Sequence, residues 1–207
     1  MTEAPAPFTA AAPEETLQRV AERLRERNIE AIVVDDGEAA RALVLERVPK
    51  GAEVYTGKSK TLQDAGILEA LQAEGEYDAL RPRYMKMDRK TQMREIRKLI
   101  GAPDYVLASV QALTEDAVLV VTSATSNQIG PISNTAGKVI LVVGAQKIVP
   151  DLDTAFRRIR EYVLPWEDEQ VRKVLPSGSF VAKILIIERE PVPGRMTVVL
   201  VRQPIGI

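Results

Sequence analysis

The sequence predicts an α/β fold: a three-layer, open, mainly parallel sheet with helices on both faces. Two observations favour it. Short runs in which every residue is apolar, such as residues 138–143, are separated along the chain by segments with helical periodicity. Such runs are typical of strands that are buried on both faces of a parallel sheet. The 207 residues, of which 45% are hydrophobic, also suffice for a core without disulfides.

The predicted elements follow one another from residue 13. Pro13 and the acidic pair at residues 14–15 favour a helix start, and an apolar stripe continues this helix to residue 28. Further helices are predicted over residues 38–48, 61–75, 88–100 and 151–163. Strands are predicted over residues 31–34, 53–56, 105–108, 118–121, 138–143, 180–188 and 196–202. The turn cluster at residues 191–194 separates the last two strands, which we expect to add a C-terminal antiparallel edge or hairpin.

The domain organisation is simple. No linker or internal repeat divides the chain, so we expect one domain over residues 13–207. The Ala/Pro-rich residues 1–12 predict a disordered tail. We expect no membrane span, because no apolar run approaches the roughly 20 residues that one needs. With no signal-peptide pattern at the N-terminus, we also expect a cytoplasmic protein.

The composition excludes several kinds of site. The chain has no cysteine and no histidine. It therefore cannot form a thiolate nucleophile, a Ser–His–Asp triad, a Cys/His zinc site or a cysteine-ligated iron–sulfur cluster. Any acid–base chemistry is left to Asp, Glu, Lys, Tyr or water, and any metal site must use oxygen ligands. The net charge of −1 excludes a globally basic nucleic-acid binder.

The loop after the predicted strand 53–56 is the first candidate for ligand binding. Ligands bind beyond the carboxyl ends of strands in open α/β sheets. Here Gly57, Ser59, Lys60 and Thr61 lie between a strand and a helix. Glycine, a hydroxyl, cations and a helix N-terminus form an anion-binding arrangement, although the Walker A spacing is missing. The alternative is an ordinary strand–helix turn with Ser59 as the helix cap.

The acidic pair between two apolar strands is the second candidate. Glu115 precedes Asp116 there. Glu115 suits a general base, a nucleophilic carboxylate or a magnesium ligand. The alternative is a solvated β-turn, in which Asp is common.

Two further segments follow apolar strands. The loop at residues 123–137 is uncharged and rich in hydroxyls, amides and glycine. It predicts either a set of neutral ligand contacts or a flexible crossover. Lys147 follows the strand that ends at Gly144. It suits pairing with Glu115 or binding of a carboxylate, acyl group or phosphate, and the alternative is a surface lysine.

Residues 81–98 are locally basic, with eight Lys and Arg residues against two acidic ones. This charge attracts anions, but one aromatic residue, Tyr84, gives nucleic-acid bases little to stack on. A solvated helix face is the favoured interpretation, and we do not expect nucleic-acid binding. The single tryptophan, Trp166, predicts core packing or a subunit contact rather than ligand stacking.

The stretch V-V-G-A-Q-K-I-V-P-D-L-D at residues 142–153 resembles the LUD (lactate-utilisation) domain family of LutC-like proteins. The stretch A-S-V-Q-A-L-T-E-D at residues 108–116 strengthens the resemblance. It implies a fold of the sugar-phosphate isomerase and CoA-transferase superfamily (NagB/RpiA/CoA-transferase-like). It also points to a pocket. The implied pocket residues are Glu115, Asn127, Gln128, Gly130, Pro131 and Lys147. The family often has glycine where this chain has Ala117, which would be strained at a positive φ.

The resemblance implies a component of a system that oxidises L-lactate to pyruvate. The chain itself is expected to hold no cofactor, and the iron–sulfur clusters are expected only in separate partner subunits. The alternative is a stand-alone CoA-transferase-like enzyme, or a small-anion-binding protein, that uses Glu115. A small anionic ligand fits both hypotheses, and a homo-oligomer is compatible with both.

Overall fold

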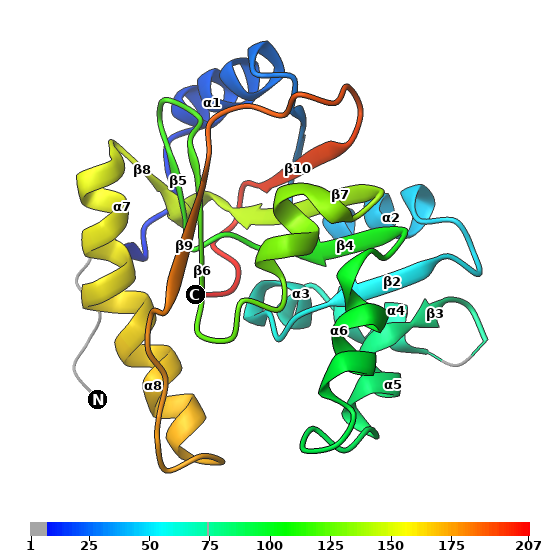
Figure 1. Ribbon diagram of the computed structural model, residues 1–207. Helices are drawn as coiled ribbons and strands as arrows, with labels where there is room; N and C mark the ends of the chain where they lie inside the picture. The colour runs from blue at the N-terminus through cyan, green and yellow to red at the C-terminus, as the bar shows by residue number, and fades with distance from the viewer. Residues whose placement is uncertain (1–7, 74) are drawn as a thin grey trace.

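The computed structural model describes residues 8–73 and 75–207, and it confirms the predicted α/β fold (Figure 1). The main sheet, sheet A, has the strand order β1-β10-β7-β4-β2-β3, and neighbouring strands are parallel throughout. Its strands are β1 (Glu30–Val34), β2 (Glu53–Thr56), β3 (Asp78–Ala79), β4 (Tyr105–Ala108), β7 (Lys138–Gly144) and β10 (Met196–Val201).

A second, mixed sheet lies beside it. Sheet B has the strand order β8-β5-β6-β9. Its strands are β5 (Ala112–Thr114), β6 (Leu119–Ser123), β8 (Ile148–Val149) and β9 (Lys183–Ile187). β6 pairs antiparallel with both β5 and β9, whereas β5 and β8 are parallel.

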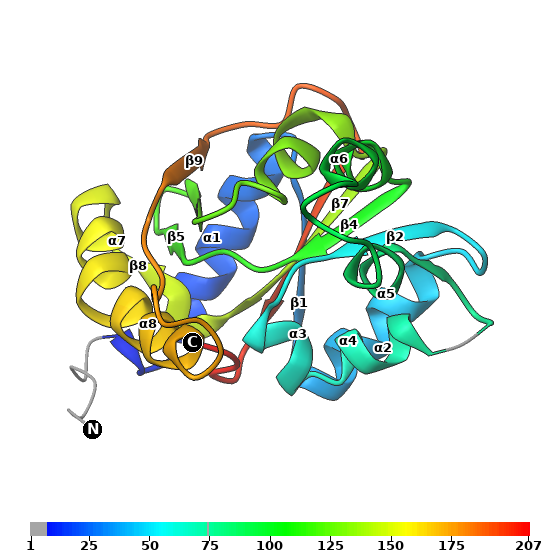
Figure 2. The ribbon, with the colours of Figure 1, turned by 60° about the horizontal axis from the view of Figure 1, so that its bottom comes forward.

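Helices cover both faces of sheet A (Figure 2). One face packs against α2 (Gly37–Arg47), α3 (Lys60–Asp64) and α4 (Ile67–Gln72). The other face packs against sheet B and against α1 (Glu14–Glu26), α5 (Leu80–Met85) and α6 (Met93–Gly101). The outer face of sheet B packs against α7 (Leu152–Arg158) and the π-helical segment η4 (Ile159–Val163). These two continue into α8 (Leu164–Arg172).

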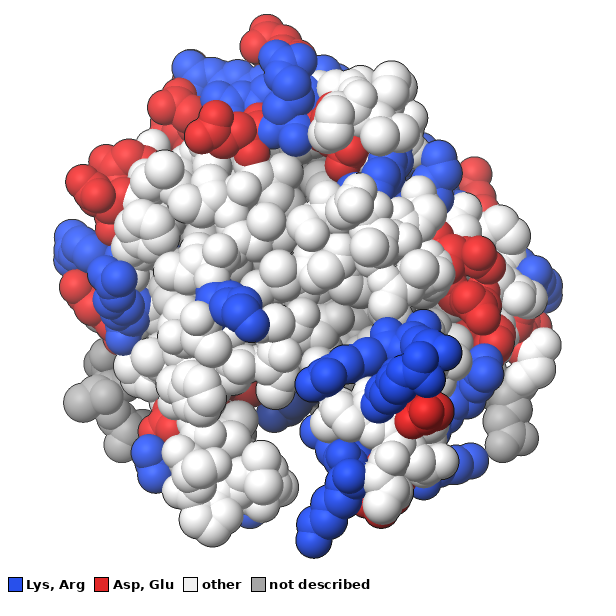
Figure 3. Space-filling model, in the orientation of Figure 1, with Lys and Arg blue, Asp and Glu red and all other residues white. Residues whose placement is uncertain are grey.

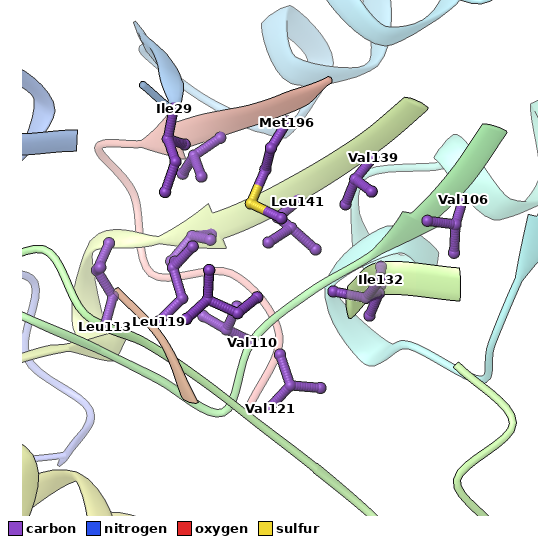
Figure 4. Close-up of a cluster of buried hydrophobic side chains, with 14 of the residues drawn as sticks. Ile29, Val106, Val110, Leu113, Leu119, Val121, Ile132, Val139, Leu141 and Met196 are labelled. Atoms are coloured by element: carbon purple, nitrogen blue, oxygen red, sulfur yellow. The ribbon is translucent and has the colours of Figure 1, made fainter. Parts of the chain in front are cut away.

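The core follows from strands that are apolar on both faces. In β7, Val139 and Leu141 point into the cluster on the sheet B side, where Figure 4 shows them beside Ile132 and Met196. The intervening Ile140 belongs to the cluster beneath α2, α3 and α4. Because successive side chains of a strand point to opposite faces, an unbroken apolar run fills two cores at once.

The C-terminal strands follow only part of the prediction. β9 does form an antiparallel edge, although it lies in sheet B. The hairpin is wrong, because β10 lies between β1 and β7 and pairs parallel with both. The reason is burial: all six residues of β10 are buried, while β9 keeps Ile184 and Ile186 partly exposed. A fully apolar strand is stabilised at the centre of the sheet.

Three predicted helices have different boundaries. The helix over 151–163 does not end at residue 163, because α7 and η4 continue into α8 as far as Arg172. The helix over 61–75 is divided into α3 and α4 at Gly66, whose φ of 67° breaks the helical path. The helix over 88–100 begins only at Met93, and the preceding residues 80–85 form α5. The short strands β3, β5 and β8 have two or three residues each, too few for a periodic signal.

Residues 1–7 of the expected tail lie outside the described residues. From residue 8 the chain is packed: Phe8 is 2% exposed and stacks on Tyr162, with 6.3 Å between the ring centroids. The N–H of Ala12 donates to the carbonyl of Ala145. Within residues 8–73 and 75–207, no helix is both long and apolar enough to cross a membrane.

Candidate functional site

A cavity of about 620 Å³ opens between α5 and the end of α8. Figure 3 shows this hollow at the lower edge of the molecule, between an uncharged lobe and a lobe rich in Lys and Arg. We call the cationic lining residues the basic wall and the apolar lining residues the apolar wall. The basic wall consists of Lys58, Lys60, Arg81 and Arg89. The apolar wall consists of Trp166, Val171, Val174, Leu175 and Phe180.

Lys147 lies in the wall of this cavity and is 2% exposed. It ends η3 (Ala145–Lys147), the 3₁₀ turn that follows β7. Its Nζ donates to Thr61 Oγ1 at 2.8 Å, to Ser109 Oγ at 3.0 Å and to the Val110 carbonyl at 3.2 Å. All three acceptors are neutral, and Lys147 forms no ion pair with any residue in the described ranges.

The parallel sheet explains why these residues meet. Ser109 directly follows β4, and Lys147 follows the neighbouring strand β7. Thr61 lies in the first turn of the helix after β2, which is the next strand on the other side of β4. The carboxyl ends of parallel strands meet at one edge of the sheet, so residues far apart in sequence converge there.

Burial lowers the pKa of Lys147 to about 7. Loss of hydration is the largest cause, and the positive charge of Arg158 acts in the same direction. The negative charge of Asp64 acts in the opposite direction. Near neutral pH, Lys147 is therefore divided between ammonium and free amine.

Among the described residues, Arg158 is a second buried cation without a carboxylate partner. Its side chain is fully buried, and its guanidinium lies 5.4 Å from the centre of the Tyr162 ring. Nη1 donates to the carbonyl of Gln111, while Nε and Nη2 have no hydrogen-bond partner among the described residues. Burial lowers the pKa of Arg158 to about 10, so it stays charged beside Lys147 at neutral pH.

The Gly57–Thr61 loop lines the cavity, and its residues have different roles there. Ser59 accepts a hydrogen bond from the N–H of Leu62 at 3.3 Å and so caps α3, as the alternative interpretation expected. Lys60 pairs with Asp64 within the same helix. Gly57 leaves room for Gln128, because a Cβ at this position would lie 2.6 Å from Gln128 Oε1.

The predicted segment from Asn127 to Pro131 is divided. Asn127 and Gln128 line the cavity. Gly130 is exposed and does not line it. Pro131 begins the π-helical turn η2 (Pro131–Thr135), and its carbonyl accepts from Arg195 Nη2 at 2.9 Å. These last two residues therefore have structural positions outside the cavity.

Glu115 does not share the cavity with Lys147. It lies in the turn between β5 and β6, where its carboxylate accepts from Arg19 Nη2 of α1 at 2.6 Å. The neighbouring Asp116 pairs with Arg23 at 2.7 Å. The alternative interpretation, a solvated β-turn, therefore fits Glu115 and Asp116. In the described part of the chain, no cluster of three or more acidic side chains could hold a metal ion.

Comparison with known proteins shows the family of this chain. The sequence profile of the LUD domain matches residues 17–201. The chain belongs to the LUD domain family. A solved structure described as a DUF162 family protein from Deinococcus radiodurans covers 93% of this chain and 99% of its own, with a TM-score of 0.57. At 13% identity this likeness shows the fold alone. No curated protein matches the chain.

Ala117, at which the resemblance implied glycine, has the backbone conformation that glycine favours. Ala117 is buried and has a φ of 62°, in the left-handed region that favours glycine. The strain lies at the Glu115 turn, away from the cavity. Residues 115–117 of this turn do not line the cavity.

The sequence missed several residues of the site. Arg81 and Arg89 belong to the basic segment that was interpreted as a solvated face, and both line the cavity. Ser109 carries a signal that could have found it, because it directly follows a predicted strand. Trp166 lines the cavity of this LUD domain, where core packing or a subunit contact was expected. The apolar wall carries no motif, because it forms only when the segment after α8 folds back.

Proposed function

We propose that this LUD domain is a LutC-like component of a lactate-utilisation system and that it binds a small carboxylate beside Lys147. The observation that carries the proposal is the buried Lys147, whose Nζ has only neutral partners at the wall of the cavity. A buried cation without a counter-ion is costly, and an anionic ligand would offset that cost.

The charge around the cavity supports an anionic ligand. Five Lys and Arg side chains line it, against one acidic side chain, Glu167, among the described residues. Glu167 lies 3.9 Å from Lys58, and Lys60 is paired with Asp64. Arg81 and Arg89 form no ion pair within residues 8–73 and 75–207. They are therefore free to attract a carboxylate.

The family and the composition support the proposed pathway. LUD resemblance points to oxidation of L-lactate to pyruvate, which removes two electrons from the substrate. A chain without cysteine cannot hold an iron–sulfur cluster on thiolates. We therefore propose that separate iron–sulfur subunits accept the electrons and that this domain contributes the carboxylate site, in the cytoplasm.

Calorimetric titration of the full chain with L-lactate and with pyruvate tests the carboxylate site. Lys147→Met keeps a long unbranched side chain and removes the charge, so we expect affinity to fall about 10- to 100-fold, as for loss of a charged hydrogen bond. Lys50→Met, at a lysine that is 77% exposed and outside the cavity, is the matched control. Unchanged affinity in Lys147→Met would place the carboxylate elsewhere.

Reconstitution tests the pathway. Lactate-dependent dye reduction is measured with the iron–sulfur partners, with and without this protein. We expect a higher rate in its presence and co-purification of the subunits. Equal rates without physical association would exclude a role as a component of the system.

A further inference from the structure

Lys147 is placed as a nucleophile as well as a cation. With neither cysteine nor histidine in the chain, lysine supplies the strongest nitrogen nucleophile. Only the free amine attacks a carbonyl, and two features of the fold favour that form. They are enclosure of the side chain and the neighbouring charge of Arg158. Burial and a nearby cation are the means by which proteins activate lysine for Schiff-base formation.

The surroundings of Nζ also suit the reaction. The hydroxyl of Ser109 donates to the Val142 carbonyl at 2.6 Å, so its oxygen is left to accept from Lys147. Thr61 Oγ1 lies 2.8 Å from Nζ, and Thr61 lines the same cavity. A hydroxyl both accepts and donates, and Thr61 can therefore pass a proton between the amine and a bound carbonyl oxygen.

We propose that Lys147 forms a Schiff base with the carbonyl carbon of a 2-oxo acid bound in this cavity. The inference rests on the proposed carboxylate site and adds a covalent step to it. The free amine adds to the carbonyl carbon, and a proton passes from nitrogen to oxygen to give a carbinolamine. The second N–H proton and the hydroxyl then leave as water, and the C=N bond forms. No electrons are transferred, and hydrolysis restores the amine and the acid.

The cavity favours a 2-oxo acid over an uncharged carbonyl compound. Once the amine has reacted with the carbonyl, the carboxylate needs a separate cation, and Arg81 and Arg89 of the basic wall line the same cavity. A guanidinium matches a carboxylate through two parallel N–H donors. A 2-oxo acid is also what two-electron oxidation of a 2-hydroxy acid produces.

Reductive trapping tests the inference. The full chain is incubated with pyruvate and sodium cyanoborohydride, which reduces an imine to a stable amine, and the modified residue is mapped by peptide mass spectrometry. We expect the adduct on Lys147 to form fastest. Its rate at pH 7 should exceed that at Lys50 on the order of a hundredfold, because an ordinary lysine is almost fully protonated there. An adduct rate at Lys147 no higher than at exposed lysines would overturn the proposal.

The pH dependence of trapping shows whether Lys147 reacts because its amine is deprotonated or only because pyruvate can reach it. Arg158 of α7 and Asp64 of α3 are the charged groups that act on Lys147, while Thr61, Ser109 and Val110 are neutral. Removing the Arg158 charge in Arg158→Met should raise the pKa of Lys147. Trapping should then slow at pH 7 and recover at higher pH. A loss that higher pH does not restore, in a variant that is folded by circular dichroism, would contradict the role given to Arg158.

Titration without the reductant distinguishes this inference from the proposed function. If L-lactate and pyruvate bind but pyruvate gives no adduct at Lys147, the Schiff base is excluded and the carboxylate site stands. If neither acid binds and no adduct forms, both proposals fail. L-Lactate has no ketone group, so it should give no adduct and should slow trapping by pyruvate.

Discussion

Arg195 and Lys147 are both buried cations, yet their surroundings differ. Arg195 Nη1 donates to the Glu190 carboxylate at 2.7 Å, and its other nitrogens donate to three backbone carbonyls. Lys147 has only two hydroxyls and one carbonyl. The first cation is fully paired and holds η2 against the chain that enters β10. The second keeps its charge uncompensated at a cavity, which is typical of a functional site.

The largest expected effect on stability comes from breaking the ion pair between Glu190 and Arg195. Glu190→Gln leaves Arg195 as a buried charge without its carboxylate, and such losses cost about 3–5 kcal/mol. Urea unfolding of the variant measures the change. The control is Glu161→Gln, which breaks an exposed helical pair with Arg157 and should cost far less, because solvent screens exposed ion pairs. Equal costs for the two variants would show that burial does not distinguish Arg195.

The free energy of unfolding should depend on pH through the titration of Lys147. Its pKa is about 7 in the folded protein and has the ordinary value of 10.5 in the unfolded chain. Between these two pH values the unfolded chain therefore binds one more proton than the folded protein. The free energy of unfolding of the wild type should therefore rise with pH in this window, by up to about 1.4 kcal/mol per pH unit, relative to Lys147→Met. Below pH 7 the two should run parallel.

Urea unfolding of both proteins from pH 6 to pH 10 measures this difference. Comparison with the variant cancels the titration of other groups. A difference that stays constant across the window would mean that Lys147 keeps its proton, and the contrast with Arg195 would then lose its basis.

The smallest effect is expected at Glu115. Glu115→Gln should leave carboxylate binding and pyruvate trapping unchanged, because Glu115 pairs with Arg19 outside the cavity. Both side chains are more than one-third exposed, so loss of their ion pair should cost less than about 1 kcal/mol. The same titration and unfolding assays apply. A marked loss of lactate affinity would place Glu115 in the site after all.

The sequence predicted the fold well where its signals were long and apolar. Residues 138–143 match β7, and residues 105–108 match β4. The position of β10 could not be read from its sequence neighbours, because its pairing partners β1 and β7 are distant in the chain. The turn at residues 191–194 suggested a local hairpin, but burial of β10 in the parallel sheet prevailed.

The sequence singled out part of the cavity lining. The loop at residues 57–61, the pair Asn127–Gln128 and Lys147 do line one cavity. Glu115 follows a strand too, but β5 belongs to sheet B, and its end leads to α1 instead of the cavity. Sequence patterns show that a residue follows a strand, and they do not show to which sheet the strand belongs.

The sequence alone determined which chemistry this LUD domain can offer. Without cysteine and histidine, carboxylates, hydroxyls, amides and amines remain. Only the tertiary structure decided which of them is poised to act. The partners of Lys147 lie 86 and 38 residues away, at Thr61 and Ser109, and the carboxylate predicted to join it lies elsewhere. A pKa depends on burial and on nearby charges, and both arise only when distant segments pack together.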